Sequence, residues 1–552
     1  MTSKISRRNL VTQLGVASAA AAGGWALSGP DAQAQSGSSS PSAANPDATH
    51  IKATRGGYRV RPTGVDDHPN LEWALRSISP GGTVRLVAGT YKMGNTAIVA
   101  DFDGTLVGAG ANKTTITCTD ELNYELWEAP GGGRDQALPK PPPFPRRPIA
   151  GTHTKAAPGM ILFYKTPLQS GQDPDDRANR IEVRNLRCRG AMIGERWTFG
   201  DEVLCFTILN SIDWNSPESM QQTTRQDVLF TGVDVDGYAT DEFPVFGNGC
   251  ACITVLGGPI LTDNYDLDGA TDGDALGASN GGLLGVNPAE GDVTFRDCAF
   301  KNCRLGPGVV GYKDGNLLFD SITTDGCRGN CLQLFDNSNC RMEVRNCELF
   351  CDSFLLPPEL TPGGASTDIP SSLGCVVAFQ GFAAALGFPS NLRWLTLAVD
   401  SAAHVTHPEA GPLGTWRPLG PALVPAPSTL RVADSSCLSP GTPNSYCVHV
   451  IDVANLAFGA ETLSATIRDN RCEGSQTCIG IEHVNESIIR DNRCDSLEFG
   501  IELHDAFDAR IRDNRFRSPS GVTGCEIRTL ASGDKIDFYR ALPGAGVCTA
   551  QG

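Results

Sequence analysis

The sequence lacks the short motifs that identify several common enzyme classes. It contains no P-loop for nucleotide phosphates and no H-E-x-x-H helix for a catalytic zinc ion. No C-x-x-C pair is joined by a second pair at zinc-finger spacing. These absences exclude the P-loop nucleotide enzymes, the zincins and the zinc fingers.

A basic charge balance and a long apolar run are also missing. The chain has 45 Lys and Arg against 62 Asp and Glu, a formal net charge of −17 at pH 7. Nucleic acids and anionic membranes bind basic surfaces, so we expect no nucleic-acid partner. The apolar stretch that ends at Leu27 is interrupted by Thr12, Gln13 and Ser18, so it is too short and too polar to span a bilayer. We therefore expect no membrane insertion.

The first residues have the pattern of a twin-arginine export signal. Ser6-Arg7-Arg8-Asn9-Leu10-Val11 precedes an Ala-rich stretch, and Ala32-Gln33-Ala34 is a small-residue cleavage pattern. We predict a signal peptide over residues 1–34 and a flexible Ser/Pro/Ala-rich spacer over residues 35–54. The expected location of the mature chain is the periplasm or the extracellular space.

Twenty cysteines recur at regular distances. The recurring sets are Cys303, Cys327 and Cys351, 24 residues apart, and Cys472 and Cys494, 22 apart. Such spacing predicts equivalent interior positions on stacked coils, and twin-arginine cargo is exported folded, so we expect many buried thiols. Cys437 and Cys447 are close in sequence and remain candidates for a disulfide.

Short strands repeat along the chain. The sequence Ile-Arg-Asp-Asn-Arg begins at Ile467, Ile489 and Ile511, a period of 22 residues. Upstream copies begin at Val293, Leu317 and Met342, at steps of 24 and 25. Each copy is an alternating strand closed by Asn, Asp or Gly, which tolerate the backbone of a tight corner. The period is too short for pairs of helices, and the leucine-rich frame is missing, so the repeats predict stacked parallel β-coils.

The N-terminal part supplies the cap that an open stack of coils requires. Asp67-His68-Pro69-Asn70 leads into Leu71, Ala74, Leu75 and Ile78, the spacing of an amphipathic helix. Three insertions interrupt the coils, near residues 129–158, 262–292 and 357–445. Long loops on a rigid scaffold often form binding sites, and they can equally be packing decoration.

The helix, the strands that follow it and the downstream repeats together resemble the pectate-lyase-like β-helix proteins. The first of these strands are Gly82-Thr83-Val84-Arg85-Leu86 and Gly104-Thr105-Leu106-Val107-Gly108. The resemblance covers roughly residues 55–550. It implies an all-β fold, a single-stranded right-handed parallel β-helix of 22–25-residue coils, and a polysaccharide as partner.

A polar ladder is predicted on one side of this β-helix. Five strands share an apolar alternation, and the side chains between their apolar residues point outward: Gln333, His449, Gly480, Glu502 and Glu526. The position after the strand carries Asp336, Asp452, His483 and Asp505. Carboxylates and histidines on neighbouring rungs, about 5 Å apart, could bind sugar or move protons. Equally, Asp and His at these positions could simply end strands by bonding to turn backbone.

Candidate roles follow from the ladder and from one further resemblance. Gly500-Ile501-Glu502-Leu503-His504-Asp505 resembles the Asp-Pro-His-Asp motif of mannuronan C5-epimerases, in which only His504 and Asp505 match. That resemblance implies that His504 abstracts a proton and that Asp505 assists it. We predict catalytic roles for His483, His504, Asp505 and the turn residue Lys313, and substrate binding by Asp336, His449, Asp452 and Glu502.

The acidic segment 263–274 offers oxygen ligands for a possible Ca²⁺ ion, with Asp266, Asp268 and Asp272 as the candidates. Its spacing does not match an EF-hand. A solvated acidic loop is the alternative.

These features lead to one function and its alternatives. The first expectation is an exported polysaccharide-active enzyme, a lyase that removes a proton from a uronate-containing glycan. A glycoside hydrolase or a C5-epimerase would use similar side chains. A non-catalytic glycan-binding or surface scaffold is the remaining alternative, because a fold alone does not establish an activity.

Overall fold

The computed structural model describes the greater part of the predicted β-helix. The described residues are 49–94, 97–118, 160–165, 178–189, 204–210, 225–236, 252–256, 289–301, 303, 306–310, 312–327, 330–335, 337–351, 374–380, 426–439, 445–452, 455, 461–506, 508–517, 527–529, 536–540 and 547–549. The predicted signal peptide and the predicted insertion near 129–158 lie outside these residues, as do Asp266, Asp268, Asp272, Asp336 and Glu526.

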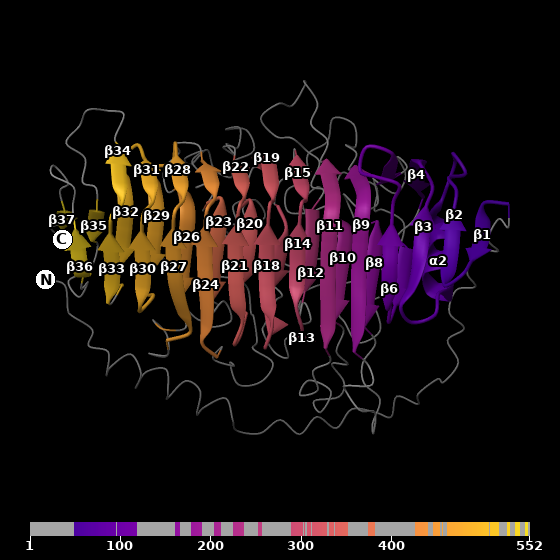
Figure 1. The fold of residues 1–552 in the computed structure, drawn as a ribbon, viewed down its shortest axis with the longest axis horizontal. Helices are drawn as coiled ribbons and strands as arrows, with labels where there is room; N and C mark the ends of the chain where they lie inside the picture. The colour runs from indigo at the N-terminus through magenta and orange to yellow at the C-terminus, as the bar shows by residue number, and fades with distance from the viewer. Residues whose placement is uncertain are drawn as a thin grey trace, which may run out of the picture. The chain divides into compact units, whose positions relative to one another are not determined.

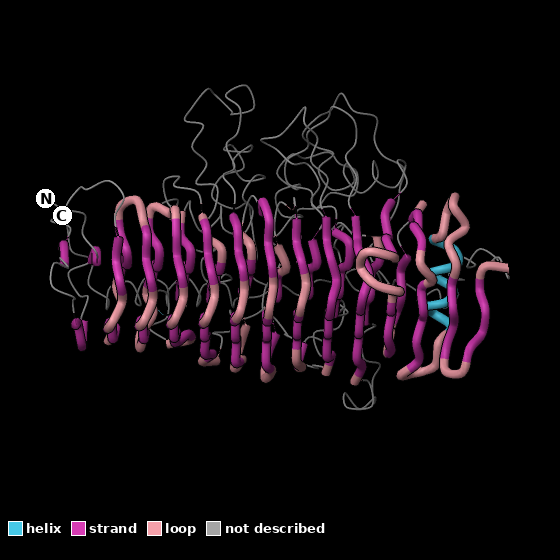
Figure 2. Tube along the Cα trace, turned by 45° about the horizontal axis from the view of Figure 1, so that its top comes forward, coloured by secondary structure: helices cyan, strands magenta, loops and turns pink. Residues whose placement is uncertain are grey.

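The fold is a parallel β-helix, as the repeats predicted (Figures 1 and 2). Late coils contribute three strands each, for example β27 (Leu463–Arg468), β28 (Arg471–Glu473) and β29 (Thr477–Glu482). Each strand pairs in parallel with the equivalent strand of the next coil, so that β27, β28 and β29 pair with β30, β31 and β32. The stacked strands form three faces.

The first face contains β2 (Gly57–Val60), β3 (Gly82–Leu86), β6 (Gly104–Val107), β14 (Val293–Arg296), β18 (Asn316–Asp320), β21 (Arg341–Arg345), β24 (Ser428–Ala433), β27, β30 (Ser487–Arg490), β33 (Ala509–Arg512) and β36 (Ile536–Arg540). The second face contains β4 (Gly89–Met93), β7 (Thr114–Cys118), β15 (Ala299–Lys301), β19 (Thr323–Cys327), β22 (Glu348–Cys351), β25 (Ser436–Leu438), β28, β31 (Arg493–Asp495) and β34 (Arg515–Arg517). The long strands β9 (Asn179–Arg189) and β11 (Gln226–Asp236) run through both faces and join them into one sheet.

The third face is a separate sheet of 12 strands. It contains β5 (Ala97–Ala100), β8 (Ile161–Lys165), β10 (Leu204–Asn210), β12 (Cys252–Leu256), β16 (Gly308–Val310), β20 (Leu332–Phe335), β23 (Val376–Gln380), β26 (Tyr446–Asp452), β29, β32 (Phe499–His504), β35 (Ile527–Thr529) and β37 (Val547–Thr549). Two short strands, β13 (Ala289–Glu290) and β17 (Tyr312–Lys313), form a small third sheet. The candidate site lies on the third face.

The predicted cap is present as α2 (His68–Ser77). Asp67 precedes the helix and Pro69 stands in its first turn, where a missing backbone N–H does no harm. Leu71, Ala74 and Leu75 are buried against the first coils. No helix in the described ranges is long and apolar enough to cross a membrane.

Two predicted boundaries differ from the structure. Residues 51–54, which the composition placed in the spacer, form β1 (Ile51–Thr54) and pair antiparallel with β2. The end of the predicted insertion 357–445 forms β24 and β25, which continue the stack from β21 and β22. The sequence did not predict these two strands, because a long proline-rich insertion separates them from the previous copy of the repeat.

The repeated Asp-Asn pair closes the corner between the first two faces. Asp469, Asp491 and Asp513 adopt left-handed backbone with φ of 55–57°. The following Asn470, Asn492 and Asn514 are buried and stacked. The Asn470 backbone N–H donates to Oδ1 of Asn492 at 3.0 Å, and Asn492 repeats this bond to Asn514. The repeated Asn side chains therefore form a buried amide ladder, which provides hydrogen-bond partners for the polar backbone groups of each corner.

The core is a continuous row of stacked side chains. Phe230, Phe295 and Phe319 stack on successive coils with ring centroids 5.1 Å apart. Fifteen of the described cysteines are buried thiols that form no disulfide, as the coil spacing predicted. The disulfide considered for Cys437 and Cys447 does not form, because both are free and the Cys447 thiol donates to the Cys437 carbonyl at 3.4 Å. Burial raises the pKa of Cys298 and Cys347 to about 12, which keeps these thiols protonated.

Candidate functional site

The candidate site lies at the ends of β26, β29 and β32 on the third face. Val448, Val450, Ile479 and Ile481 point inward and belong to the core. The alternate residues therefore point outward. Parallel pairing sets them in two columns: Gln333, Val377, His449, Gly480 and Glu502 form one, and Phe335, Phe379, Ile451, Glu482 and His504 form the other. The sequence predicted Gln333, His449, Gly480 and Glu502 in the first column, and the register confirms these four. The prediction for Glu526 was wrong, because Glu502 pairs with Arg528.

The second column changes from apolar to polar at β29. Phe335, Phe379 and Ile451 stand before the change, and Glu482 and His504 stand after it. Glu482 is a functional candidate that the polar ladder omitted. The signal was present, because Glu482 stands two residues after the outward Gly480, and residues two apart in a strand share a face.

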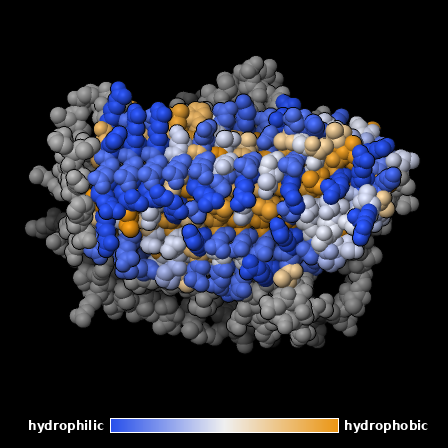
Figure 3. All heavy atoms as spheres, viewed as in Figure 1, coloured by the Kyte–Doolittle hydropathy of each residue, from blue (hydrophilic) through white to orange (hydrophobic). Residues whose placement is uncertain are grey.

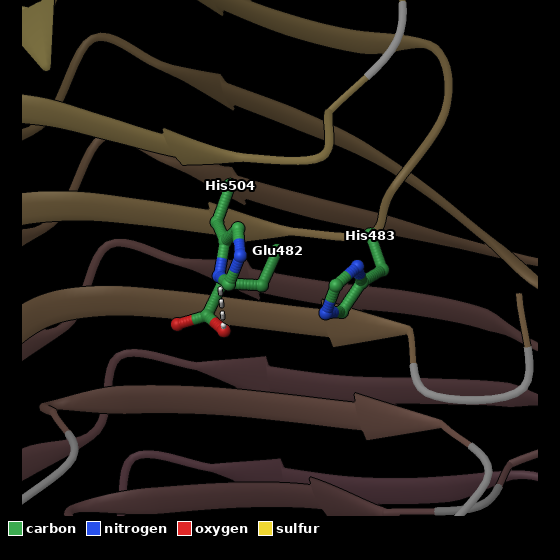
Figure 4. Close-up of side chains that lie close together, drawn as sticks. All are labelled: Glu482, His483 and His504. Atoms are coloured by element: carbon green, nitrogen blue, oxygen red, sulfur yellow. Dashed lines mark ion pairs between the residues drawn. The ribbon is translucent and has the colours of Figure 1, made fainter. Parts of the chain in front are cut away.

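Glu482 lies between His449 and His504, and Figure 4 shows its carboxylate next to His504. Its Oε1 is 2.7 Å from Nε2 of His449, and its Oε2 is 3.7 Å from Nδ1 of His504. Burial favours the neutral acid, but hydrogen bonds and the charges of His449 and His504 outweigh it and lower the pKa of Glu482 to about 2. Glu482 is therefore a buried carboxylate anion that pairs with both imidazoles.

Gly480 makes room for the ring that supports this pair. Tyr446 stacks on His449 with ring centroids 3.9 Å apart. A Cβ atom on Gly480 would lie 2.6 Å from Cε1 of Tyr446. The Tyr446 hydroxyl also donates to Oε1 of Glu502 at 3.3 Å. A glycine is thus required at position 480. The ring that it accommodates, Tyr446, connects His449 to Glu502.

His483 and Asp505 follow the ends of β29 and β32 in left-handed backbone, with φ of 57° and 48°. Nδ1 of His483 lies 3.6 Å from Oδ2 of Asp505, and the His483 and His504 rings are 5.0 Å apart. Burial and the neighbouring His504 lower the pKa of His483, which favours its neutral form.

Two of the five side chains of the cluster are accessible to solvent. The side chains of His449, Glu482 and His483 are 1%, 8% and 7% exposed, whereas those of His504 and Asp505 are 37% and 38% exposed. Any ligand therefore reaches the cluster from the side of His504 and Asp505.

Two predicted site residues have other roles. The carboxylate of Asp452 is buried and accepts hydrogen bonds from the backbone N–H groups of Asn455, Thr462 and Leu463 and from the Thr462 hydroxyl. This arrangement closes a turn, so Asp452 is a structural residue rather than a substrate ligand.

Lys313 is also separated from the cluster. Its Nζ is 3.2 Å from Oε1 of Glu290. It follows β16, which is five strands from β32, the strand of His504, in the order β16, β20, β23, β26, β29, β32. At about 4.8 Å per strand, this is about 24 Å along the stack. Lys313 therefore cannot reach the bond on which His504 would act.

A parallel β-helix with a histidine and carboxylate cluster on one face is the class that these observations define. No protein-family model matches the chain, and no curated protein matches it in sequence. Solved structures that align with it include the A-module of the mannuronan C-5 epimerase AlgE4 from Azotobacter vinelandii, with 11% identity, 88% of this chain and 92% of that chain covered, and a TM-score of 0.37.

Two further alignments have similar values. The Streptococcus pneumoniae surface protein and adhesin PfbA is 11% identical, with 85% and 97% of the two chains covered and a TM-score of 0.39. The catalytic domain of a GH87 alpha-1,3-glucanase in complex with tetrasaccharides is 8% identical, with 89% and 70% covered and a TM-score of 0.36. TM-scores this low carry no inference about ligand or activity, which must come from the site.

Proposed function

We propose that the chain is an exported polysaccharide-active enzyme, a lyase that acts on a uronate-containing glycan. The observation that carries this proposal is the position of His504, a half-exposed imidazole next to the buried Glu482 carboxylate. Proton abstraction beside a uronate carboxylate requires such a base in reach of solvent-borne substrate. Glu482 and its partner His449 would hold the His504 ring and stabilise the imidazolium that forms.

The ion pairing of Glu482 favours proton abstraction over glycoside hydrolysis. A hydrolase needs one carboxylic acid that can protonate the leaving oxygen. Glu482 is held between two imidazoles as an anion, so it is a poor proton donor. A C5-epimerase would begin with the same abstraction by His504. A proton would then return to the opposite face of C5, whereas in the lyase the bond from C4 to the glycosidic oxygen breaks, a C4–C5 double bond forms and that oxygen takes up a proton from solvent. The epimerase therefore remains the second candidate activity.

The lyase step also needs a positive group near the substrate carboxylate. Lys313 cannot supply it, and we propose Ca²⁺ for this role. The exposed Asp505, next to the cluster, is the candidate ligand there. Asp266, Asp268 and Asp272, the ligands that the sequence predicted, lie outside the described residues and remain candidates for a separate Ca²⁺ ion. Removing Ca²⁺ with a selective chelator should then abolish activity, and adding Ca²⁺ back should restore it.

The test is a panel of uronate and neutral polysaccharides incubated with the purified protein and Ca²⁺. A lyase forms a double bond, so unsaturated products absorb in the ultraviolet. A hydrolase forms reducing ends without that absorbance, and an epimerase changes the sugar without cleaving the chain, which proton NMR detects. Binding of a glycan without any of these products would favour the non-catalytic scaffold and overturn the proposal.

A further inference from the structure

We propose that Glu482, His483 and His504 form a binding site for one divalent transition-metal ion of the Zn²⁺ type. Each residue offers one ligand atom, and these atoms all lie within 4.8 Å of one another. Ligands of a tetrahedral zinc ion, at 2.0–2.1 Å, are about 3.4 Å apart. Closing this difference requires only small side-chain rotations.

The backbone explains how consecutive residues serve one site. Glu482 and His504 occupy paired positions on adjacent strands, so they lie one above the other. His483 follows Glu482 directly and would point to the opposite side in a regular strand. Its φ of 57° breaks the alternation, and Figure 4 shows His483 on the same side as Glu482 and His504.

The neighbours supply the support that metal ligands usually have. His449 contacts Oε1 of Glu482 at 2.7 Å, while Oε2 faces His504. Asp505 Oδ2 lies 3.6 Å from Nδ1 of His483, an arrangement in which a carboxylate orients the imidazole and Nε2 becomes the ligand. Metal-bound histidines and carboxylates are commonly positioned by such outer partners.

The ligand chemistry selects the ion. Two imidazoles and one carboxylate suit Zn²⁺, Co²⁺ or Ni²⁺, whereas Ca²⁺ prefers six or more oxygen ligands. The site therefore differs in its ligands from the Ca²⁺ site of the proposed function, although Asp505, a candidate Ca²⁺ ligand there, is the partner of His483 here. A second relation rests on the proposed function: a metal ion on His504 would occupy the base, so Zn²⁺ should inhibit the lyase.

Binding is tested by calorimetric titration of the folded, metal-free chain with ZnCl₂, and by the visible spectrum of the Co²⁺ complex. We expect one ion per chain and the intense visible bands of low-coordinate Co²⁺. Glu482→Gln and His504→Gln should each weaken binding by more than tenfold. His449→Phe, which keeps the stacking on Tyr446, should weaken binding by about tenfold to a hundredfold through the lost contact to Glu482.

His68→Gln is the matched control. His68 also pairs with a glutamate, Nε2 to Oε2 of Glu72 at 2.9 Å, but it lies on α2 and belongs to no group of three possible metal ligands among the described residues. This variant should bind Zn²⁺ as the parent does. Circular dichroism and melting temperature show whether each variant is folded, and His504→Gln, at the exposed edge, is the variant whose folding is least at risk.

Unchanged affinity in both Glu482→Gln and His504→Gln would overturn the proposal. Thiolate-to-cobalt charge-transfer bands would overturn it too, because they would place the ion on cysteines. The metal-binding measurements do not depend on catalysis. Zn²⁺ binding without any glycan product would contradict the proposed function alone, and a His504-dependent lyase that binds no Zn²⁺ would contradict the metal site alone.

Discussion

The first and third faces are built from the same coils but use their outward side chains differently. On the first face, half-buried Arg side chains pair across coils with carboxylates that are mostly buried, such as Arg345 with Asp320 at 2.9 Å and Arg431 with Glu343 at 2.8 Å. Figure 3 shows a largely hydrophilic surface in this view of the molecule. On the third face, β23, β26 and β29 are buried along their whole length, outward residues included.

This difference separates structural repeats from functional residues. A charge that recurs every 22 residues pairs within its own coil, as Arg468 does with Asp469 and Arg490 with Asp491. The third face breaks its own pattern with Gly480, Glu482 and His504, each of which differs from the residues at the same position in adjacent coils. Buried polar groups carry a desolvation cost, so their presence here needs a reason, and a site supplies one.

Of the mutations that test this difference between the faces, the one with the largest expected effect alters catalysis at the third face. His504→Gln should lower the rate of glycan cleavage by about a hundredfold to ten-thousandfold, because it removes the proposed base. Its melting temperature should stay close to that of the parent, since the side chain is half exposed. Rates of both proteins on the best glycan of the panel, with His68→Gln as control, provide the measurement. A fully active His504→Gln variant would show that His504 is not the base and that this cluster on the third face does not take part in the reaction.

The amide ladder at the corner should give the largest effect on stability. Asn492→Ala removes the acceptor of the Asn470 backbone N–H and the donor to the Ile467 carbonyl, both buried. We expect the free energy of unfolding to fall by about 3 kcal/mol. Urea unfolding measures it, and Asn316→Ala, which removes an exposed bond to Asp292, should cost far less. Equal losses in the two variants would contradict the structural role of the ladder.

Local repeats explain which parts of the molecule the sequence could predict. The period of Ile467, Ile489 and Ile511 predicted the coils and their register, because parallel stacking places equivalent residues on adjacent strands. Apolar alternation likewise predicted that His449, Gly480 and Glu502 share a column.

The remaining parts depend on contacts that the repeat does not encode. Asp452 and His483 occupy equivalent strand-end positions, yet Asp452 turns to a loop backbone and His483 to the cluster. Lys313 was grouped with the histidines because the long insertion after residue 357 conceals how many coils separate them. Burial of the outward third face also cannot be read from alternation, which distinguishes inward from outward but not covered from exposed.

A steric change at Gly480 tests whether the third face is packed around the cluster. Gly480→Ala places a Cβ atom 2.6 Å from Cε1 of Tyr446 and 3.0 Å from Cδ2 of His449. We expect a loss of about 1–3 kcal/mol in the free energy of unfolding, together with reduced activity. Gly308→Ala is the matched control in the same column, since its nearest neighbour would be Cβ of Gln333 at 3.6 Å. Similar effects of both variants would show that the space at Gly480 has no special role.

The smallest expected effect concerns the ion pairs of the first face. Asp320 accepts from Arg345 at 2.9 Å and from Asn346 at 3.0 Å. The Arg345 hydrogen bond, which outweighs the opposing effect of burial, lowers the pKa of Asp320 below its ordinary 3.8. A carboxylate with a depressed native pKa stabilises the fold above its unfolded pKa, and this stabilisation is lost as pH falls through the native pKa. Asp320→Asn should therefore cost about 1 kcal/mol near neutral pH, because the exposed arginine is screened by solvent.

The difference between parent and Asp320→Asn should shrink as the pH falls below the unfolded pKa of aspartate, and urea midpoints measured across this range would follow it. Asp325→Asn is the matched control, since Asp325 pairs with Lys301 at 3.1 Å but both side chains are more than half exposed. It should change stability little at any pH. A pH-independent difference for Asp320→Asn would mean that the first face depends on the shape of this side chain rather than on its charge, and the contrast between the two faces would then rest on burial alone.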